Sequence, residues 1–248
     1  MYNIPTVTKN ILIINVLMFL CTFVAQKSYG IDLNDYLGLH FILSDRFNLA
    51  QLITYMFMHG GFAHLFFNMF TVWMFGRILE QVWGPRRFLF YYLMCGIGAG
   101  LVQEAVVGIQ YLIAHSALPT EIVQTIYNEG AQVLSEEMNY TDTNAANLNL
   151  ALNGYTIGAS GAVYAILLGF GMLFPNQQLF IFPLPIPIKA KYFVAGYALI
   201  ELWSGIANNP YDSTAHFAHL GGMLFGFLLI WYWRHTNKNN GYNGYYYN

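Results

Sequence analysis

The sequence predicts an all-α, polytopic membrane protein built as a bundle of six transmembrane helices. Of its 248 residues, 56% are hydrophobic and only 9% are charged, whereas about a quarter of a typical soluble domain is charged. The mean hydropathy is +0.43. Apolar runs of membrane-spanning character recur along the chain between short polar or basic segments. The few Lys and Arg residues are scattered, so no clustered basic face indicates a nucleic-acid partner.

Three spans are predicted in the first half of the chain. The first, Ile11 to Ala25, resembles the apolar core of a signal peptide, but no small-x-small cleavage site follows it, so we interpret it as a membrane helix. The mixed stretch from Gln26 to Ala50 is expected to be a loop that lies partly in the membrane interface and does not need to span. A second span is predicted from Phe62 to Trp83 and a third from Phe88 to Val107, separated by a basic turn at 84–87.

An acidic insertion follows the third span, from Gly108 to Asn153. It contains no lysine or arginine, and its acidic residues are Glu121, Glu129, Glu136, Glu137 and Asp142. We expect it to lie outside the membrane. Apolar residues at roughly helical spacing predict a helix from Thr120 to Leu134, after a Pro-Thr start that could cap it.

The second half of the chain contains three more predicted spans. These are Tyr155 to Phe174, Tyr192 to Ile206 (after a proline-rich loop) and Ala215 to Trp233. The tail from His235 to Asn248 is rich in Asn, Gly and Tyr, has little packing potential and is expected to be disordered. A single membrane domain is therefore predicted over residues 1–234, with the acidic insertion at about 108–153.

Six spans place both termini on the same side of the membrane. The Lys and Arg residues on that side are Lys9, Arg77, Arg86, Arg87, Lys189, Lys191, Arg234 and Lys238. Only Lys27 and Arg46 lie on the other side. By the positive-inside rule, both termini are cytoplasmic. We expect a multi-pass integral protein of the bacterial inner (cell) membrane, and the spans that carry Ser160 and His219 then both begin at the non-cytoplasmic side.

A serine among small residues, Gly158-Ala159-Ser160-Gly161, lies near the start of the fourth predicted span. Such residues usually allow close helix packing in a membrane, and on that interpretation Ser160 has no chemical role. However, His219 lies in an equally apolar segment, and an ionisable side chain at such depth is a functional candidate. If the fourth helix begins near Ser160, its free N–H groups and dipole point at that serine, where an oxyanion could develop.

His219 can act as a base for Ser160 only if the two side chains come within about 3 Å. The fourth and sixth helices must then nearly touch. Gly222 and Gly226 lie one and two turns after His219 and supply a small-residue face for that contact. Tyr164, one turn after Ser160, shares the face of the serine and could stack on the imidazole.

A further polar pair, His64 and Asn68, opens the second span with i, i+4 spacing. Two donors on one helix face can bind a single oxygen atom. Without a serine nearby, such a pair is more often an interhelical hydrogen-bond network. A metal site made of His59, His64, His216 and His219 is a weaker alternative, because neither an HExxH motif nor a cysteine cluster is present. We therefore expect no metal and no cofactor.

Together these residues resemble the rhomboid intramembrane serine proteases. The resemblance covers residues 11–233 except the insertion. It is carried by the Gly-x-Ser-Gly stretch with Tyr164 after it, by His219 followed by Gly222 and Gly226, and by the helix face of His64 and Asn68. Each motif alone is weak, and their combination is specific.

The resemblance implies a serine endopeptidase with Ser160 as nucleophile and His219 as base, with no aspartate as a third member. His64, Asn68 and the backbone N–H of Ser160 would form the oxyanion hole. The implied substrates are transmembrane polypeptides, cleaved near the non-cytoplasmic membrane face, and the lipid bilayer is the other partner. The spacing Gly76-x-x-x-Glu80 also matches the family, with Glu80 expected to be a structural hydrogen-bonding carboxylate.

Two features depart from the family pattern, and two other functions remain open. The first loop lacks the Trp-Arg pair that many members carry, and the insertion is longer than usual. The main alternative function is a catalytically inactive rhomboid-like protein that binds or escorts membrane clients, against which the presence of Ser160 and His219 counts. A transporter or channel would need paired charges or broken helices in both halves, which Glu104 and Glu201, near span ends, do not supply.

Overall fold

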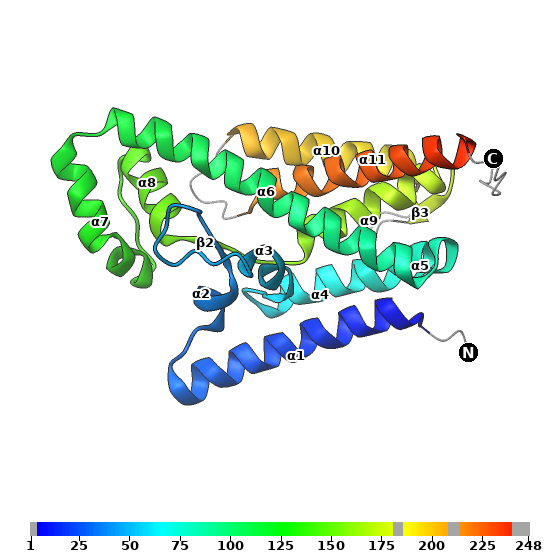
Figure 1. Ribbon diagram of the computed structural model, residues 1–248, viewed down its shortest axis with the longest axis horizontal. Coiled ribbons are helices and arrows are strands. Elements are labelled where there is room, and N and C mark those ends of the chain that lie inside the picture. Colours follow the sequence, from blue (N-terminus) through cyan, green and yellow to red (C-terminus); the bar gives the residue numbers. More distant parts are fainter. Residues whose placement is uncertain (1–3, 181–185, 208–213, 240–248) are drawn as a thin grey trace.

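The structure, a computed structural model, describes residues 4–180, 186–207 and 214–239. Within these ranges the chain is largely helical, and its strands form only two short antiparallel pairs, β1 with β2 and β3 with β4. Figure 1 shows the long helices lying side by side, with α7 and α8 gathered at one end of the molecule. The protein is therefore an all-α helical membrane bundle, as predicted.

The first predicted span lies in α1 (Thr6–Tyr29), which ends where Gly30 turns the chain with a φ of 67°. The following segment consists of short elements: α2 (Leu33–Leu37), β1 (Leu39–His40), α3 (Gln51–Thr54) and the 3-10 turn η1 (Tyr55–Phe57). None of these elements is long enough to cross a bilayer. The expectation that this segment does not span is confirmed.

The second predicted span is one helical stretch that changes type midway. It runs as α4 (Phe62–Thr71), the π-helical turn η2 (Val72–Gly76) and α5 (Arg77–Trp83). Gly84, with a φ of 79°, leads into α6 (Pro85–Ala117), where a proline at the first helical position loses no hydrogen bond. The insertion was expected to begin at Gly108, but α6 continues ten residues past Val107. Its extra length packs against the insertion through the buried Ala114.

The insertion folds into two helices, α7 (Thr120–Ser135) and α8 (Thr143–Asn153). They form a small core of their own with the end of α6, made of Ala114, Val123, Ile126, Ala145, Leu148 and Leu152. The predicted helix 120–134 is confirmed, but no side chain caps its start. The side chain of Asp142 instead caps α8 by accepting from the backbone N–H of Ala145 at 2.9 Å.

The fourth span differs from the prediction at its start. It was expected to be helical from Tyr155, but α9 (Ser160–Leu173) begins at Ser160, because Tyr155 and Thr156 form β2 and pair with β1. The N–H of Gly158, whose φ is 127°, donates to the carbonyl of Tyr55 at 2.9 Å. Protein groups thus bind this extended backbone, as a membrane interior requires. A 14-residue helix is about 21 Å long, shorter than the roughly 30 Å hydrocarbon core, so α9 by itself is too short to cross a bilayer.

Helices occupy the last two predicted spans, namely α10 (Ala190–Ala207) and α11 (His216–Asn239), and α10 follows the pair β3 (Gln178–Phe180) and β4 (Pro187–Lys189). The tail was expected to be disordered from His235, but α11 continues through Asn239, because no Gly or Pro occurs there to end the helix. Residues 240–248 lie outside the described part of the chain.

The centre of the bundle is α9, which packs against α6 and α11. Nine of its fourteen residues are buried, which makes it the inner helix. The outer helices instead expose large apolar side chains, such as Phe67 (66%) and Trp203 (76%). Within the described residues, three stretches are long and apolar enough to cross a membrane, namely Thr6–Tyr29, Phe62–Trp83 and Pro85–Ala117. An apolar exterior of this extent is typical of contact with lipid.

Candidate active site

Ser160 and His219 lie within hydrogen-bond distance of each other. Ser160 is the first residue of α9 and His219 is in the first turn of α11. Their Oγ and Nε2 atoms are 2.8 Å apart, and His219 is buried with 7% of its surface exposed. When Nε2 carries no proton, the serine hydroxyl donates to it. This is the geometry that a serine nucleophile and its base require.

Glycines bring the helices of the two residues together. A side-chain carbon at Gly222 of α11 would overlap the carbonyl oxygen of Gly161 in α9, so the two backbones touch directly. One turn further on, a carbon at Gly226 would lie 3.2 Å from Cβ of Ala165. A carbon at Gly161 would overlap Cβ of Ala99 in α6. Gly222 and Gly226 thus lie where α11 closely approaches α9, and Gly161 lies where α9 closely approaches α6.

The second nitrogen of His219 contacts Glu201 of α10. Nδ1 of His219 lies 2.9 Å from Oε2 of Glu201, which is itself buried, with 5% of its surface exposed. Nδ1 of His216 lies 2.7 Å from the same oxygen. The hydroxyl of Tyr164 donates to Oε1, and the Tyr164 ring stacks on His219 with centroids 4.2 Å apart and planes inclined by 9°.

Sequence reasoning missed Glu201, which it treated as an isolated charge near the end of a span. Among the described residues, the carboxylate that lies beside His219 is that of Glu201. A signal was present in the sequence: an ionisable residue within an apolar span is a functional candidate. That argument selected His219 and applied equally to Glu201.

His64, one of the residues predicted for the oxyanion hole, lies near the start of α9. A side-chain carbon at Gly158 would lie 2.7 Å from Nε2 of His64 and 3.6 Å from Oγ of Ser160, so the edge of the His64 ring faces the backbone just before the serine. The first N–H groups of α9, including that of Ser160, have no carbonyl partner within the helix. They are available donors for an oxygen at this place.

Asn68 is held by His59, a residue that the sequence suggested only as a metal ligand. Nδ2 of Asn68 lies 3.1 Å from Nε2 of His59, and the rings of His59 and His64 meet edge to face at 4.9 Å. Burial and the neighbouring His64 lower the pKa of His59 to about 4. His59 is therefore neutral near pH 7, and its Nε2 can accept from the amide of Asn68.

Among the described residues, one group could offer three ligand atoms to a metal: Glu201, His216 and His219, whose atoms lie within 4.8 Å of one another. It is not the set of four histidines considered from the sequence. The same atoms are already joined by hydrogen bonds. A metal on Nδ1 would displace the proton of His219 to Nε2, and Nε2 could then no longer accept from Ser160. Metal ligation and base function at His219 thus exclude each other.

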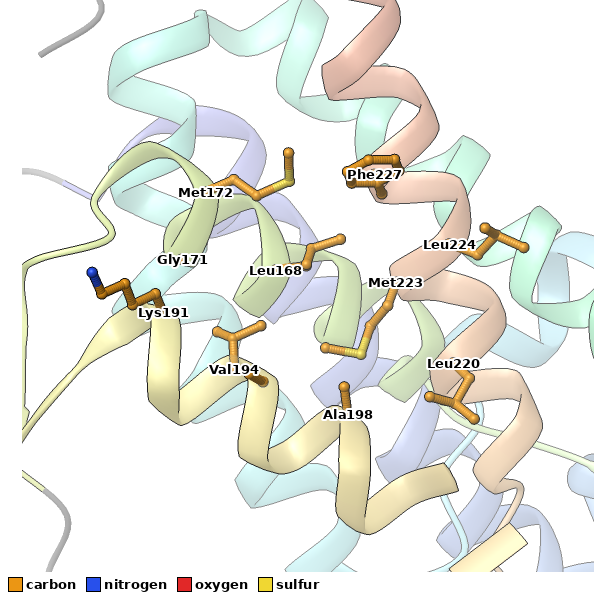
Figure 2. Close-up of a pocket in the computed structure, with 11 residues that line it drawn as sticks. Leu168, Gly171, Met172, Lys191, Val194, Ala198, Leu220, Met223, Leu224 and Phe227 are labelled. Carbon is orange, nitrogen blue, oxygen red and sulfur yellow. The ribbon is translucent and has the colours of Figure 1, made fainter. Parts of the chain in front are cut away.

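A cavity of about 430 Å³ lies between α9, α10 and α11. Figure 2 shows apolar side chains around it, including Leu168, Val194 and Met223, with the amine of Lys191 at its edge. Leu220, which follows His219 in the chain, lines one part of it. Apart from the amine of Lys191 at its edge, the lining is apolar and offers no group for proton transfer, so we look for the chemistry among the polar residues around Ser160.

The fold and the site define a polytopic membrane protein with a serine–histidine pair at the start of its central helix. Comparison with known proteins agrees with this class: the Rhomboid domain model matches residues 46–236. The chain belongs to the rhomboid family.

Several curated proteins are similar to the chain. The Putative rhomboid protease YdcA of Bacillus subtilis is 43% identical over 183 residues, which cover 73% of this chain and 67% of that protein. Rhomboid protein 1, mitochondrial, of Saccharomyces cerevisiae is 27% identical over 176 residues, which cover 71% of this chain but only 39% of the relative. Rhomboid-like protein 11, chloroplastic, of Arabidopsis thaliana is 23% identical over 187 residues, or 51% of its length.

Proposed function

We propose that the protein is an intramembrane serine endopeptidase that cleaves transmembrane polypeptides, with Ser160 as nucleophile and His219 as general base. The observation that carries this proposal is the 2.8 Å contact between Oγ of Ser160 and Nε2 of His219 at the start of α9. Membership of the rhomboid family supports it. The main alternative is a catalytically inactive family member that binds or escorts membrane clients, and such a protein would have no use for a serine nucleophile with a base in contact.

The chemistry follows from these two side chains. Oγ of Ser160 attacks the scissile carbonyl carbon while Nε2 of His219 takes the hydroxyl proton, and a tetrahedral intermediate forms. The imidazolium then gives that proton to the leaving amine as the peptide bond breaks. Water enters, loses a proton to His219 and attacks the acyl-enzyme ester, which releases the second product and restores the hydroxyl of Ser160.

The start of α9 would stabilise the negative oxygen of the intermediate. The proposed donors are the backbone N–H of Ser160 and the side chains of His64 and Asn68, aided by the positive end of the helix dipole. A hole of this kind would act on substrates whose helix is locally unwound, because only an extended segment exposes its carbonyl. Similarity to the family suggests a small residue at the cleaved position.

The charge distribution supports a proposed arrangement in the membrane. Cytoplasmic termini would place the start of α9, and hence cleavage, toward the non-cytoplasmic face of a bacterial inner membrane. In this arrangement residues 1–234 form one membrane domain, and the insertion projects from the same face as the site. The insertion could then border the path of an approaching substrate.

The decisive experiment compares the parent with Ser160→Ala and His219→Ala, each reconstituted in liposomes with a model single-span substrate. We expect both changes to abolish cleavage, because a nucleophile and its base fail as a unit. A fluorophosphonate probe should label the parent and not Ser160→Ala. Thermal unfolding would verify that the variants are folded, and cleavage by a folded Ser160→Ala protein would refute the proposal.

A further inference from the structure

We propose that Glu201 completes a catalytic triad with Ser160 and His219 by fixing the proton of His219 on Nδ1 and stabilising the imidazolium that forms during cleavage. The inference rests on the proposed function and assigns Glu201 as a positioning residue that acts through His219. It adds a carboxylate to what the sequence predicted as a two-residue site.

The contacts of His219 determine which nitrogen carries the proton. Oε2 of Glu201, 2.9 Å from Nδ1, can only accept when the carboxylate is ionised. The neutral imidazole then has its hydrogen on Nδ1 and its lone pair on Nε2, 2.8 Å from Oγ of Ser160. This is the tautomer that can take the serine proton, and the opposite tautomer cannot.

The carboxylate is held in place from three sides. Tyr164 donates to Oε1, and Nδ1 atoms of His216 and His219 both face Oε2. A buried carboxylate is tolerated when its lone pairs are hydrogen-bonded in this way. Tyr164 also stacks on the imidazole, so one side chain fixes both the ring plane of the base and the position of its partner. When His219 takes the serine proton, Glu201 supplies the opposite charge at a site with little access to water.

Glu80 provides a contrast within the same chain. It is also a buried carboxylate with three donors, but they are the N–H groups of Val7 and Thr8 and the hydroxyl of Thr8, at 2.7–2.9 Å. Its role is thus to bind the start of α1 to α5, where a negative charge also suits the helix dipole. Glu80 lies sixteen residues after His64 in one helical stretch, roughly 24 Å along its axis. The residue is therefore a matched control: a buried carboxylate without contact to the base.

The test is Glu201→Gln, which keeps the shape of the side chain and removes its charge. If the amide nitrogen faces His219, the imidazole is forced into the wrong tautomer, and if the amide oxygen faces it, the imidazolium loses its counter-charge. We expect kcat to fall by about 10²-fold or more, with KM nearly unchanged, and fluorophosphonate labelling to slow in parallel. Glu201→Asp, which keeps the charge on a shorter side chain, should recover part of the rate.

The control variant is Glu80→Gln. It should lower the thermal stability while leaving the rate per folded molecule within twofold of the parent.

The labelling amplitude counts folded sites, so its rate constant remains measurable in a partly unfolded variant. If Glu201→Gln does not fold at all, ¹⁵N-histidine NMR of the parent protein takes the place of that variant. His219→Gln then serves to assign the resonances of His219. We expect Nδ1 of His219 to be protonated and Nε2 to be unprotonated.

A folded Glu201→Gln protein with parent kcat and labelling rate, or a His219 with its proton on Nε2, would overturn the inference. So would a loss of rate in the parent on adding a chelator, because Glu201 would then act as a metal ligand. Activity in Ser160→Ala would instead refute the proposed function itself, so the two failures are distinguishable.

Discussion

At the scale of single residues, the orientation of a side chain proposed for the site can depend on a hydrogen bond to a neighbouring residue. Nδ2 of Asn68 lies 3.1 Å from Nε2 of His59, and this contact selects the orientation of the Asn68 amide. The low pKa of His59 keeps this nitrogen free to accept near neutral pH. A residue that touches no substrate can therefore influence the proposed oxyanion hole.

Asn68→Ala should reduce kcat by about 10²–10³-fold without abolishing cleavage, because one donor is lost while the backbone N–H and His64 remain. His59→Gln, whose amide oxygen can still accept from Asn68, should retain more activity than His59→Ala. Cleavage kinetics on the same single-span substrate provide the measurement. Equal activity of the two His59 variants would show that His59 does not orient Asn68.

At the scale of elements, the contact of α9 with α11 sets the distance between Ser160 and His219. The two residues belong to different helices, and no covalent link holds them together. Gly222 lies one turn after His219, directly on the carbonyl of Gly161, which follows Ser160 in the chain. From sequence alone, alanine at Gly222 is expected to be milder than valine. The structure shows that alanine must also disturb this contact, since even one added carbon overlaps a backbone atom.

Gly222→Ala should therefore lower kcat strongly, because the helices must separate and displacements of about 1 Å can cost on the order of 10²-fold. The control is Gly196→Ala in α10, where an added carbon would meet no atom within 4 Å. We expect Gly196→Ala to match or slightly exceed the parent in thermal stability, because alanine favours helix over glycine, and to cleave at the parent rate. A folded Gly222→Ala protein with parent activity would disprove the close contact of α9 with α11.

At the scale of the whole molecule, the insertion is a folded part of the protein. The helices α7 and α8 extend the bundle at one end, and their core continues from the outer turns of α6 (Figure 1). The insertion also joins the first loop, since the hydroxyl of Ser44 donates to the carbonyl of Leu152 at 2.8 Å. The side of the membrane on which the insertion lies is consequently also the side of the site around Ser160.

A cysteine at Asn139, an exposed residue between α7 and α8, should react with an impermeant maleimide added from the non-cytoplasmic side. A cysteine at Asn240 should react only after the membrane is permeabilised. Both substitutions belong in a background without Cys21 and Cys95, the two native cysteines. The reverse pattern of labelling would invert the proposed topology and move cleavage to the cytoplasmic face.

The sequence by itself determined the membrane class, the order of the spans and the residues to examine. Apolar run length is a local property, and so is the i, i+4 spacing that places Tyr164 on the face of Ser160 and Asn68 on that of His64. The small-residue face at Gly222 was visible for the same reason. These features follow from backbone geometry within one helix, which the order of residues specifies directly.

Only the tertiary structure decided at which residue α9 begins and which side chain contacts Nδ1 of His219. The start of α9 depends on β1 and on the carbonyl of Tyr55, both about a hundred residues earlier in the chain. The meeting of Glu201 with His219 depends on how α10 and α11 are rotated and shifted against each other. Helical periodicity groups residues on a face, but the rotation and axial position of each helix result from the packing of many side chains at once.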